Sequence, residues 1–494
     1  MKRILTIFLA LVTLLSVLAM FACAPDTAGE NQDDEGTDTD GTTYDPKLAD
    51  LDFGGEEIHF VFAESAVDNY TARSIQVDED NGNSVDTQLI TRNANVENIL
   101  GVTIDSYQAS TSISGLKGAI SNSLAAGNGQ YDIIAGYQYF DISMATEGWL
   151  VDLNNLALYG VDDYINFDAA YWGTYYNENL KYGDARFWIT GDIALRYIGG
   201  MYCTFVNKTI YMDTLYDEFG SIYDIARSGE WTMDKLVQFA GLCYQDNGNE
   251  KVDNEDQLGF AYEPIDPLDG IAFGCQVPFS TKYADGTIKI TLNSDRTKKF
   301  LEKLDNLCNG SFALNIGSQD SGIVMPAFAN GNIAFTTNKI FMAESYLQKM
   351  EDDYFVLPSP KLDENQEYYV TGVHDGCTIF GIAWDSPNVE AAAATLEVMA
   401  AESYRLVTPV YYESAIKFKY TRDNDSADMI DLIREHVETD FAAVWSESID
   451  NIAQFFRANH TAKNSTSVLK RRQSTFEQKL EDLIKTLKEL EESA

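Results

Sequence analysis

The sequence has few basic residues and few histidines. It carries 35 lysines and arginines against 77 aspartates and glutamates, which gives a formal net charge of −42 over 494 residues. A chain this acidic is repelled by nucleic acids and by anionic membrane surfaces, and anionic substrates are disfavoured for the same reason. No GxSxG, HExxH or phosphate-loop motif occurs, and the four histidines are scattered. The usual motifs of serine hydrolases, zinc proteases and nucleotide-binding enzymes are therefore missing.

Cysteine is scarce as well. Of six cysteines, one lies near the N-terminus and none of the others forms a close CxxC pair. Their odd number and irregular spacing favour buried free thiols, with disulfides as the open alternative. The five later cysteines are Cys203, Cys243, Cys275, Cys308 and Cys377.

The N-terminus has the pattern of an export signal. Met1-Lys2-Arg3 is positively charged and precedes an apolar run from Ile4 to Ala22, which predicts a signal peptide over residues 1–22. An uncleaved transmembrane anchor is the alternative, because the run is long enough to span a bilayer. Either way, the basic start keeps that end inside and places the rest of the chain outside the cytoplasm.

The apolar run ends in the sequence Met20-Phe21-Ala22, which is followed by Cys23. This sequence resembles the lipobox of bacterial lipoproteins, although the bulky Phe21 departs from the usual small residue. The resemblance implies that Cys23 receives a diacylglyceryl group and becomes the mature N-terminus. Residues 23–51 are mostly acidic and small, so a disordered tether between the lipid and the folded body is predicted.

The body, residues 52–494, alternates between strand and helix patterns. Apolar residues recur every second position at 56–62, every third or fourth at 84–100 before Gly101, and continuously at 131–137. This β-α-β-α-β beginning predicts a largely parallel sheet covered by helices. Thr232 and Ser294 are expected helix caps. The C-terminal helix has a leucine-rich face, which favours core packing over a coiled-coil partner.

Several segments together resemble bacterial extracellular solute-binding proteins of family 1, the lipoproteins of ABC importers. They include "FGGEEIHFVFAES", "RNANVENILGVTI", "YDIIAGYQYFDISMATEGWLVDLNNL", "CTFVNKTIYMDTLYDEFGSIYDIARSGEWTMDKLVQFA" and "FANGNIAFTTN". The resemblance implies an α/β fold of the type II periplasmic-binding-protein class, with two lobes, a hinge and an interlobe cleft. It also implies a sugar or oligosaccharide as the solute, ABC permease subunits as partners, a monomer, and no cofactor.

Mapped onto this chain, the resemblance implies lobe 1 at about 52–190 and 336–375, and lobe 2 at about 200–330 and 380–494. Hinge crossings are expected near Gly191–Gly200, Gly331–Thr336 and Gly372–Phe380, where glycines suit backbone rotation.

Solute-binding residues are expected in loops at strand ends, the usual ligand position in open α/β sheets. Sugars need aromatic faces beside polar side chains. For each residue, a surface polar or core aromatic role is the alternative. The candidates are Glu64, Ser65, Tyr137, Gln138, Tyr139, Asp192, Arg196, Tyr197, Asn338, His374 and Asp375, with Trp172, Tyr411 and Trp445 as further aromatics.

One acidic stretch, "QDNGNEKVDNEDQ" at 245–257, resembles a calcium loop that has lost key positions, so a solvated turn is favoured and no metal site is predicted. In the calcium alternative the ligands are Asn247, Asn249, Asp253 and Asp256. A secreted glycoside hydrolase stays open as another function, because carboxylate pairs are easily found among 77 acidic residues. A surface sensor or adhesin that binds carbohydrate without transport is the third possibility. His374 and Cys377 as a nucleophile pair are disfavoured.

Overall fold

The computed structural model describes residues 44–65, 69–77, 79–80, 82–317, 322–417, 424–460 and 465–493. These residues belong to one unit of the chain, Thr43–Ala494. The predicted signal peptide, Cys23 and most of the predicted tether lie outside them. In the part of the chain that is described, a helix with the length and apolarity needed to cross a bilayer is not found.

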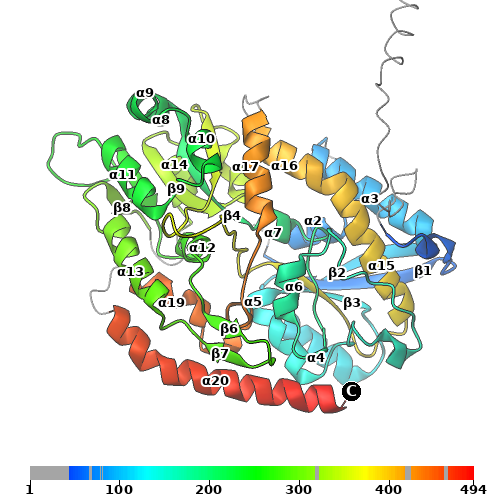
Figure 1. Cartoon of the computed structure of the whole chain (residues 1–494). Helices are drawn as coiled ribbons and strands as arrows, with labels where there is room; N and C mark the ends of the chain where they lie inside the picture. The colour runs from blue at the N-terminus through cyan, green and yellow to red at the C-terminus, as the bar shows by residue number, and fades with distance from the viewer. Residues whose placement is uncertain are drawn as a thin grey trace, which may run out of the picture. The chain divides into compact units, whose positions relative to one another are not determined.

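Two sheets form the framework, one in each lobe (Figure 1). The first sheet has the order β11-β3-β1-β2, with β11 antiparallel to three parallel strands. The second has the order β10-β4-β9-β5-β8, with β4 antiparallel to its two neighbours. The strands are β1 (Glu56–Ala63), β2 (Val102–Ser110), β3 (Ile133–Tyr137), β4 (Tyr202–Asn207), β5 (Leu258–Tyr262), β8 (Ala313–Asn315), β9 (Ile333–Lys339), β10 (Tyr354–Pro358) and β11 (Thr378–Ile382), and a separate hairpin holds β6 (Ser280–Lys282) and β7 (Ile288–Ile290).

The first lobe contains the predicted β-α-β-α-β beginning. Ile58 and Phe60 project from β1 into the core and are fully buried. Asn83 accepts a hydrogen bond from the Val85 N–H and so begins the second helix, which ends at Gly101 with φ of 63°. The helices of this lobe are α2 (Tyr70–Ile75), α3 (Ser84–Leu100), α4 (Leu116–Ala126), α5 (Gln138–Asp141), α6 (Thr174–Leu180), α7 (Leu195–Ile198), α15 (Val389–Glu402) and α16 (Thr408–Lys417), with short turns η2 (Pro46–Asp50), η3 (Ile142–Glu147), η4 (Leu156–Tyr159) and η6 (Ser403–Val407).

The second lobe confirms the two predicted caps. The Thr232 and Ser294 hydroxyls accept hydrogen bonds from the backbone N–H groups of Lys235 and Thr297. The five cysteines predicted as buried free thiols are free and buried. The helices of this lobe are α8 (Lys208–Thr214), α9 (Tyr216–Phe219), α10 (Ile222–Arg227), α11 (Met233–Cys243), α12 (Asp266–Gly274), α13 (Asp295–Cys308), α14 (Val324–Phe328), α17 (Asn424–Glu435), α18 (Phe441–Val444) and α19 (Phe455–Asn459), with short turns η5 (Ala343–Leu347), η7 (Glu447–Ile449) and η8 (Ile452–Gln454).

The structure corrects the predicted division of the second half of the chain. Residues 336–375 are expected in the first lobe, but β9 and β10 belong to the second sheet. Residues 380–494 are expected in the second lobe, but β11 joins the first sheet and α15 packs on β1 and α3. The segment Gly331–Thr336 is not a crossing, because it leads into β9, which pairs with β4 and β5. An apolar strand pattern does not encode which of two sheets the strand joins.

Two of the predicted crossings do connect the lobes, and they run side by side. The Tyr202 N–H donates to the Gly372 carbonyl and the His374 N–H donates to the Gly200 carbonyl, both at 3.0 Å. A Cβ on Gly200 would lie 2.1 Å from the Arg196 carbonyl oxygen, and one on Gly372 would lie 2.4 Å from the Phe273 ring. Glycine at these positions therefore leaves room for the Arg196 carbonyl and the Phe273 ring, which pack against the two crossings.

The folded body begins earlier than the predicted tether boundary at residue 51. Leu48 is fully buried and Tyr44 is mostly buried, and η2 packs on α3. The Asp45 carboxylate accepts a hydrogen bond from the Lys47 N–H and starts this turn. Two apolar side chains among acidic neighbours are enough to dock the segment, so residues 44–51 are not tether.

The C-terminal helix α20 (Ser465–Ser493) contacts both lobes. It packs on β7 and α13 of the second lobe and reaches η3 of the first, and Figure 1 shows it running along one side of both. As predicted, its apolar face packs into the core. The buried residues on this face are Leu469, Phe476, Leu480, Leu483 and Leu487.

Replacing Leu487 with alanine should lower the free energy of unfolding by about 2–4 kcal/mol, because the side chain is only 2% exposed and its loss leaves a cavity. Lys485→Ala is the control on the same helix, since its side chain is 78% exposed and should change stability by less than about 0.5 kcal/mol. Urea denaturation of both variants measures the difference. Equal unfolding midpoints would show that α20 is not part of the core.

Candidate ligand-binding site

The two lobes meet where the carboxyl ends of their parallel strands lead into short helices. The chain leaves β1 and enters α2 in the first lobe, and it leaves β9 and enters η5 in the second. The rings of Tyr70 and Phe341 lie 4.8 Å apart across this junction, and the Tyr70 hydroxyl is 3.3 Å from the Ser345 hydroxyl. Carboxyl ends of strands are the usual ligand-binding edge of open α/β sheets.

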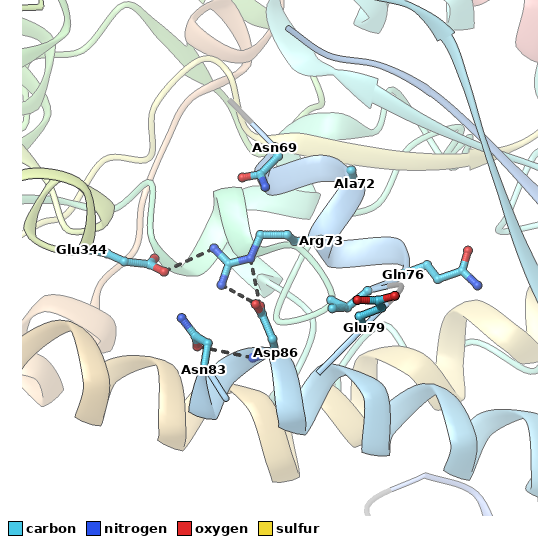
Figure 2. Close-up of a pocket in the computed structure, with 9 residues that line it drawn as sticks. Asn69, Ala72, Arg73, Gln76, Glu79, Asn83, Asp86 and Glu344 are labelled. Atoms are coloured by element: carbon cyan, nitrogen blue, oxygen red, sulfur yellow. Dashed lines mark hydrogen bonds and ion pairs between the residues drawn. The ribbon is translucent and has the colours of Figure 1, made fainter. Parts of the chain in front are cut away.

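A cavity of about 450 Å³ opens at this junction (Figure 2). Its walls come mainly from α2, the segment after it and the start of α3, with one residue from η5 of the other lobe. Its volume is within the range of small-molecule sites. The lining residues are Asn69, Ala72, Arg73, Gln76, Val77, Glu79, Asn83, Asp86 and Glu344.

Arg73 joins the two lobes within this cavity. Its Nε and Nη2 donate to Asp86 Oδ1 at 3.0 and 2.9 Å, and its Nη1 donates to Glu344 Oε1 at 3.3 Å (Figure 2). Burial alone lowers the pKa of Arg73, but the charges of Glu344 and Asp86 outweigh burial and raise it. The guanidinium is therefore permanently charged and links α2, α3 and η5.

The predicted residues Tyr137, Arg196 and His374 come together beside the crossings. The Arg196 guanidinium carbon lies 5.2 Å from the centre of the Tyr137 ring. The His374 ring is 6.4 Å from the rings of both Tyr137 and Tyr202, which belong to different sheets. The end of β3 therefore does lead to the lobe junction, as the sequence predicts.

Glu64 is buried and organises α2. Its carboxylate accepts hydrogen bonds from the N–H groups of Thr71 and Ala72 at 2.8 and 2.9 Å and from Arg196 Nη2 at 3.1 Å. Both ionic side chains are 2% exposed. These two residues, each predicted separately to bind solute, bind each other and so fix α2, and with it Arg73, against the first crossing. The half-buried Ser65 follows directly.

Tyr139 and Asp375 lie behind the wall of a second cavity, of about 440 Å³. The Tyr139 hydroxyl donates to Asn451 Oδ1 at 2.8 Å, and Asp375 accepts from Arg457 Nη2 at 2.9 Å. Burial raises the pKa of Tyr139, which keeps its hydroxyl protonated as a donor. The residues that line this cavity are Ile265, Asp450, Asn451, Gln454, Phe455, Arg457, Ala458, Asn459, Arg472 and Phe476.

Asp192 and Tyr197 line a smaller cavity of about 160 Å³ together with Trp172. Arg434 Nη2 lies 3.3 Å from Asp192 Oδ2. Burial raises the pKa of Asp192 to about 6, although Arg434 opposes the shift. This volume is below the range of about 300–1,000 Å³ that is usual for small-molecule sites.

Trp172 is itself almost fully buried, and the remaining predicted residues are enclosed by protein. The Trp172 and Trp445 indoles donate to Glu397 and to the Asn179 carbonyl, at 2.9 and 3.2 Å. Tyr411 is 1% exposed. Gln138 donates to the Val444 carbonyl at 3.2 Å, and Asn338 is buried within β9. The core role given as the alternative therefore describes the aromatic residues Trp445 and Tyr411, whereas Gln138 and Asn338 are buried polar side chains and not surface ones.

The acidic stretch at 245–257 is organised by one carboxylate. Asp256 accepts hydrogen bonds from the N–H groups of Asn247 and Asp253 at 3.0 and 3.1 Å and from the Tyr244 hydroxyl at 2.9 Å. The bond from Asn247 is the main cause of a lowered pKa of Asp256. Hydrogen bonds within the loop therefore occupy the carboxylate that the calcium alternative uses as its last ligand.

Sequence reasoning missed the side chains that line the first cavity. Arg73, Asp86 and Glu344 are absent from the predicted candidates, which cover strand ends, the expected hinge crossings and a few aromatic residues. The polar stretch between β1 and α3 carried a usable signal, since it follows a buried strand at the binding edge. Glu344 lies 271 residues from Arg73 in the chain, so their pairing has no local signature.

No protein-family model matches the chain, and no curated protein matches it either. Solved structures do. UgpB from Mycobacterium tuberculosis, in complex with glycerophosphocholine, is 13% identical with a TM-score of 0.57, covering 87% of this chain and all of that one. The cyclic alpha-maltosyl-1,6-maltose binding protein from Arthrobacter globiformis is 12% identical with a TM-score of 0.52, covering 87% and 100%. The apo form of RafE from Streptococcus pneumoniae is 12% identical with a TM-score of 0.51, covering 86% and 98%. These likenesses confirm the predicted two-lobed periplasmic-binding-protein fold.

Asp141 should make stability depend on pH. Its Oδ2 accepts from the Tyr137 N–H at 2.8 Å, and burial raises its pKa to about 7. In the unfolded chain the group ionises near pH 4. Between about pH 4 and pH 7 only the folded state keeps the proton, so the free energy of unfolding contributed by Asp141 falls as pH rises and then levels off.

Asp141→Asn keeps an acceptor for Tyr137 and removes the charge. The variant should be more stable than the unaltered chain by on the order of 4 kcal/mol at pH 8, with the gain vanishing near pH 4. Asp217→Asn, at an exposed position of α9, is the control and should show no such trend. Urea denaturation at several pH values measures the gain. A gain in stability that does not change with pH would contradict the raised pKa of Asp141.

Proposed function

We propose that the chain is an extracellular solute-binding protein of an ABC importer, anchored to the outer face of the cell membrane through a lipid on Cys23. The solute is a sugar or an oligosaccharide, held between the lobes and delivered to the permease subunits. The observation that carries this proposal is the polar cavity at the lobe junction, with Arg73 of one lobe bound to Glu344 of the other.

The chemistry of this cavity suits a neutral polyhydroxylated molecule. Carboxylates of Asp86 and Glu344 accept hydrogen bonds from hydroxyl groups, and the amides of Asn69 and Gln76 both donate and accept. None of the nine lining residues is aromatic. Stacking therefore has to come from rings next to the cavity, such as Tyr70 and Phe341, when the lobes move about the crossings.

One of the similar structures supports the choice of a sugar by its name, since it is a binding protein for a cyclic maltosyl-maltose. UgpB holds glycerophosphocholine, which is a polar solute but not a sugar. The acidic composition agrees with a neutral solute, since an anionic one would be repelled.

A hydrolase is less well supported by the same residues. A glycoside hydrolase needs one carboxyl group to give a proton to the leaving oxygen, but Asp86 and Glu344 are both bound to the same guanidinium. The alternative nucleophile, Cys377, is buried, and burial raises its pKa to about 12. It is a thiol at neutral pH and a poor nucleophile.

A thermal-shift screen against a saccharide library tests the proposal directly. A ligand at 100 times its dissociation constant should stabilise the protein by about 2.7 kcal/mol, and isothermal titration calorimetry then measures the affinity of the hit. Failure of every neutral saccharide to stabilise the protein would contradict the proposed solute class.

Asn69→Ala should weaken binding of that saccharide about tenfold, which corresponds to about 1.4 kcal/mol. Asn69 is exposed in the cavity and makes no capping bond to α2, so its loss should leave the unliganded melting temperature unchanged. Asn388→Ala is the matched control, because it also precedes a helix without a capping bond but lies outside the cavity. Equal affinities of the two variants would remove Asn69 from the site.

A further inference from the structure

Three side chains with metal-binding atoms converge on one face of the first sheet, away from the solute cavity. Glu57 and His59 are two residues apart on β1, so both project to the same side. Asp105 of β2 is the direct partner of His59 in the parallel register. The side chains of Glu57, His59 and Asp105 therefore lie next to one another on the same face of the sheet.

The three side chains lie close enough to share one ion. His59 Nδ1 lies 3.1 Å from Asp105 Oδ2 and His59 Nε2 lies 3.8 Å from Glu57 Oε2, so the two contacts use different ring nitrogens, of which one binds the ion. One ligand atom from each residue lies within 4.8 Å of the other two. Ligands of tetrahedral zinc, at bonds of about 2.0–2.2 Å, are about 3.4 Å apart. A shift of about 1 Å closes the group, and the half-exposed Glu57 side chain has room for it.

The scaffold beneath these side chains is rigid. β1 and β2 are paired from Glu56 to Ala63, and the His59 N–H donates to Asp132 Oδ2 at 2.9 Å. The imidazole is 37% exposed and the carboxylates 57% and 47%, so an ion and its water ligands can reach them. Among the described residues this is the single group of three or more such side chains that meets these distances.

We propose that Glu57, His59 and Asp105 form a binding site for a divalent transition-metal ion of the zinc type. The imidazole is a ligand that suits Zn²⁺, Co²⁺ or Ni²⁺, and carboxylate oxygens also bind zinc. They are too few oxygens for Ca²⁺, which takes six to eight, and Mg²⁺ prefers octahedral oxygen. Three protein ligands leave a position for water.

The site lies at the amino end of β1, opposite the end that leads to α2 and the solute cavity. β2 is the edge strand of the first sheet. A bound ion links this edge strand to β1. Glu64 is the residue that follows β1 in the chain. The ion therefore stabilises the folded first lobe by mass action and does not contact the solute.

Isothermal titration of the chelator-treated protein with ZnCl₂ tests the site. The titrated chain carries Cys23→Ser, so that this thiol cannot bind zinc. We expect one equivalent of Zn²⁺ to bind, at least tenfold more weakly in His59→Gln and in Asp105→Asn. His436→Gln, a histidine of the second lobe, is the control and should leave the affinity unchanged. MgCl₂ should produce no saturable binding.

Two further results keep the test decisive. The melting temperatures of the variants without zinc report whether they fold, and visible absorption of Co²⁺ bound to the Cys23→Ser chain reports nitrogen and oxygen ligation independently of the ligand variants. No saturable Zn²⁺ binding by the Cys23→Ser chain, or unchanged affinity in both folded variants, would overturn the site.

Discussion

The two hydrogen-bonded crossings are the constraint on which the rest of the structure depends. Bonds between Tyr202 and Gly372 and between His374 and Gly200 hold the segments that join the lobes side by side. Gly200 and Gly372 have no side chain, which leaves room for the Arg196 carbonyl and the Phe273 ring against these segments. With the crossings fixed, the ends of β1 and β9 must face each other, so α2 and η5 meet and enclose the polar cavity. The ion pair of Arg73 with Glu344 follows from that arrangement.

The first sheet has a different chemistry at each end. At its carboxyl ends, buried Glu64 and Arg196 fix α2, and the cavity offers charged acceptors to hydroxyl groups. At its amino ends, the exposed Glu57, His59 and Asp105 offer ligands to an ion. In a chain of net charge −42, carboxylates gathered at one place need a compensating cation. Arg73 supplies it in the cavity, and the proposed metal supplies it at the far end of β1.

Local patterns predicted the elements well and their assembly poorly. Alternation along β1, the cap at Thr232 and the leucine face of α20 are properties of short segments, and the structure has them as predicted. Sheet membership of β9 and β11 depends on partners far along the chain, so it was assigned wrongly. The position of Tyr137 at the lobe junction follows from the end of its own strand, which is a local signal. The contact of Arg73 with Glu344 joins residues far apart in the chain, so the sequence does not predict it. Trp172 and Trp445 show that an aromatic residue gives no sign of whether it lines a cleft or the core.

The account rests on a solute held between two lobes that move about the crossings. The distance between spin labels at Thr91→Cys on α3 and Glu302→Cys on α13, both exposed positions, reports that movement by pulsed electron resonance. The five native cysteines of the described body are buried, which limits competing labelling. The account predicts that a saturating saccharide found by the screen shortens the mean distance and narrows its distribution. An identical distribution with and without that saccharide would contradict it.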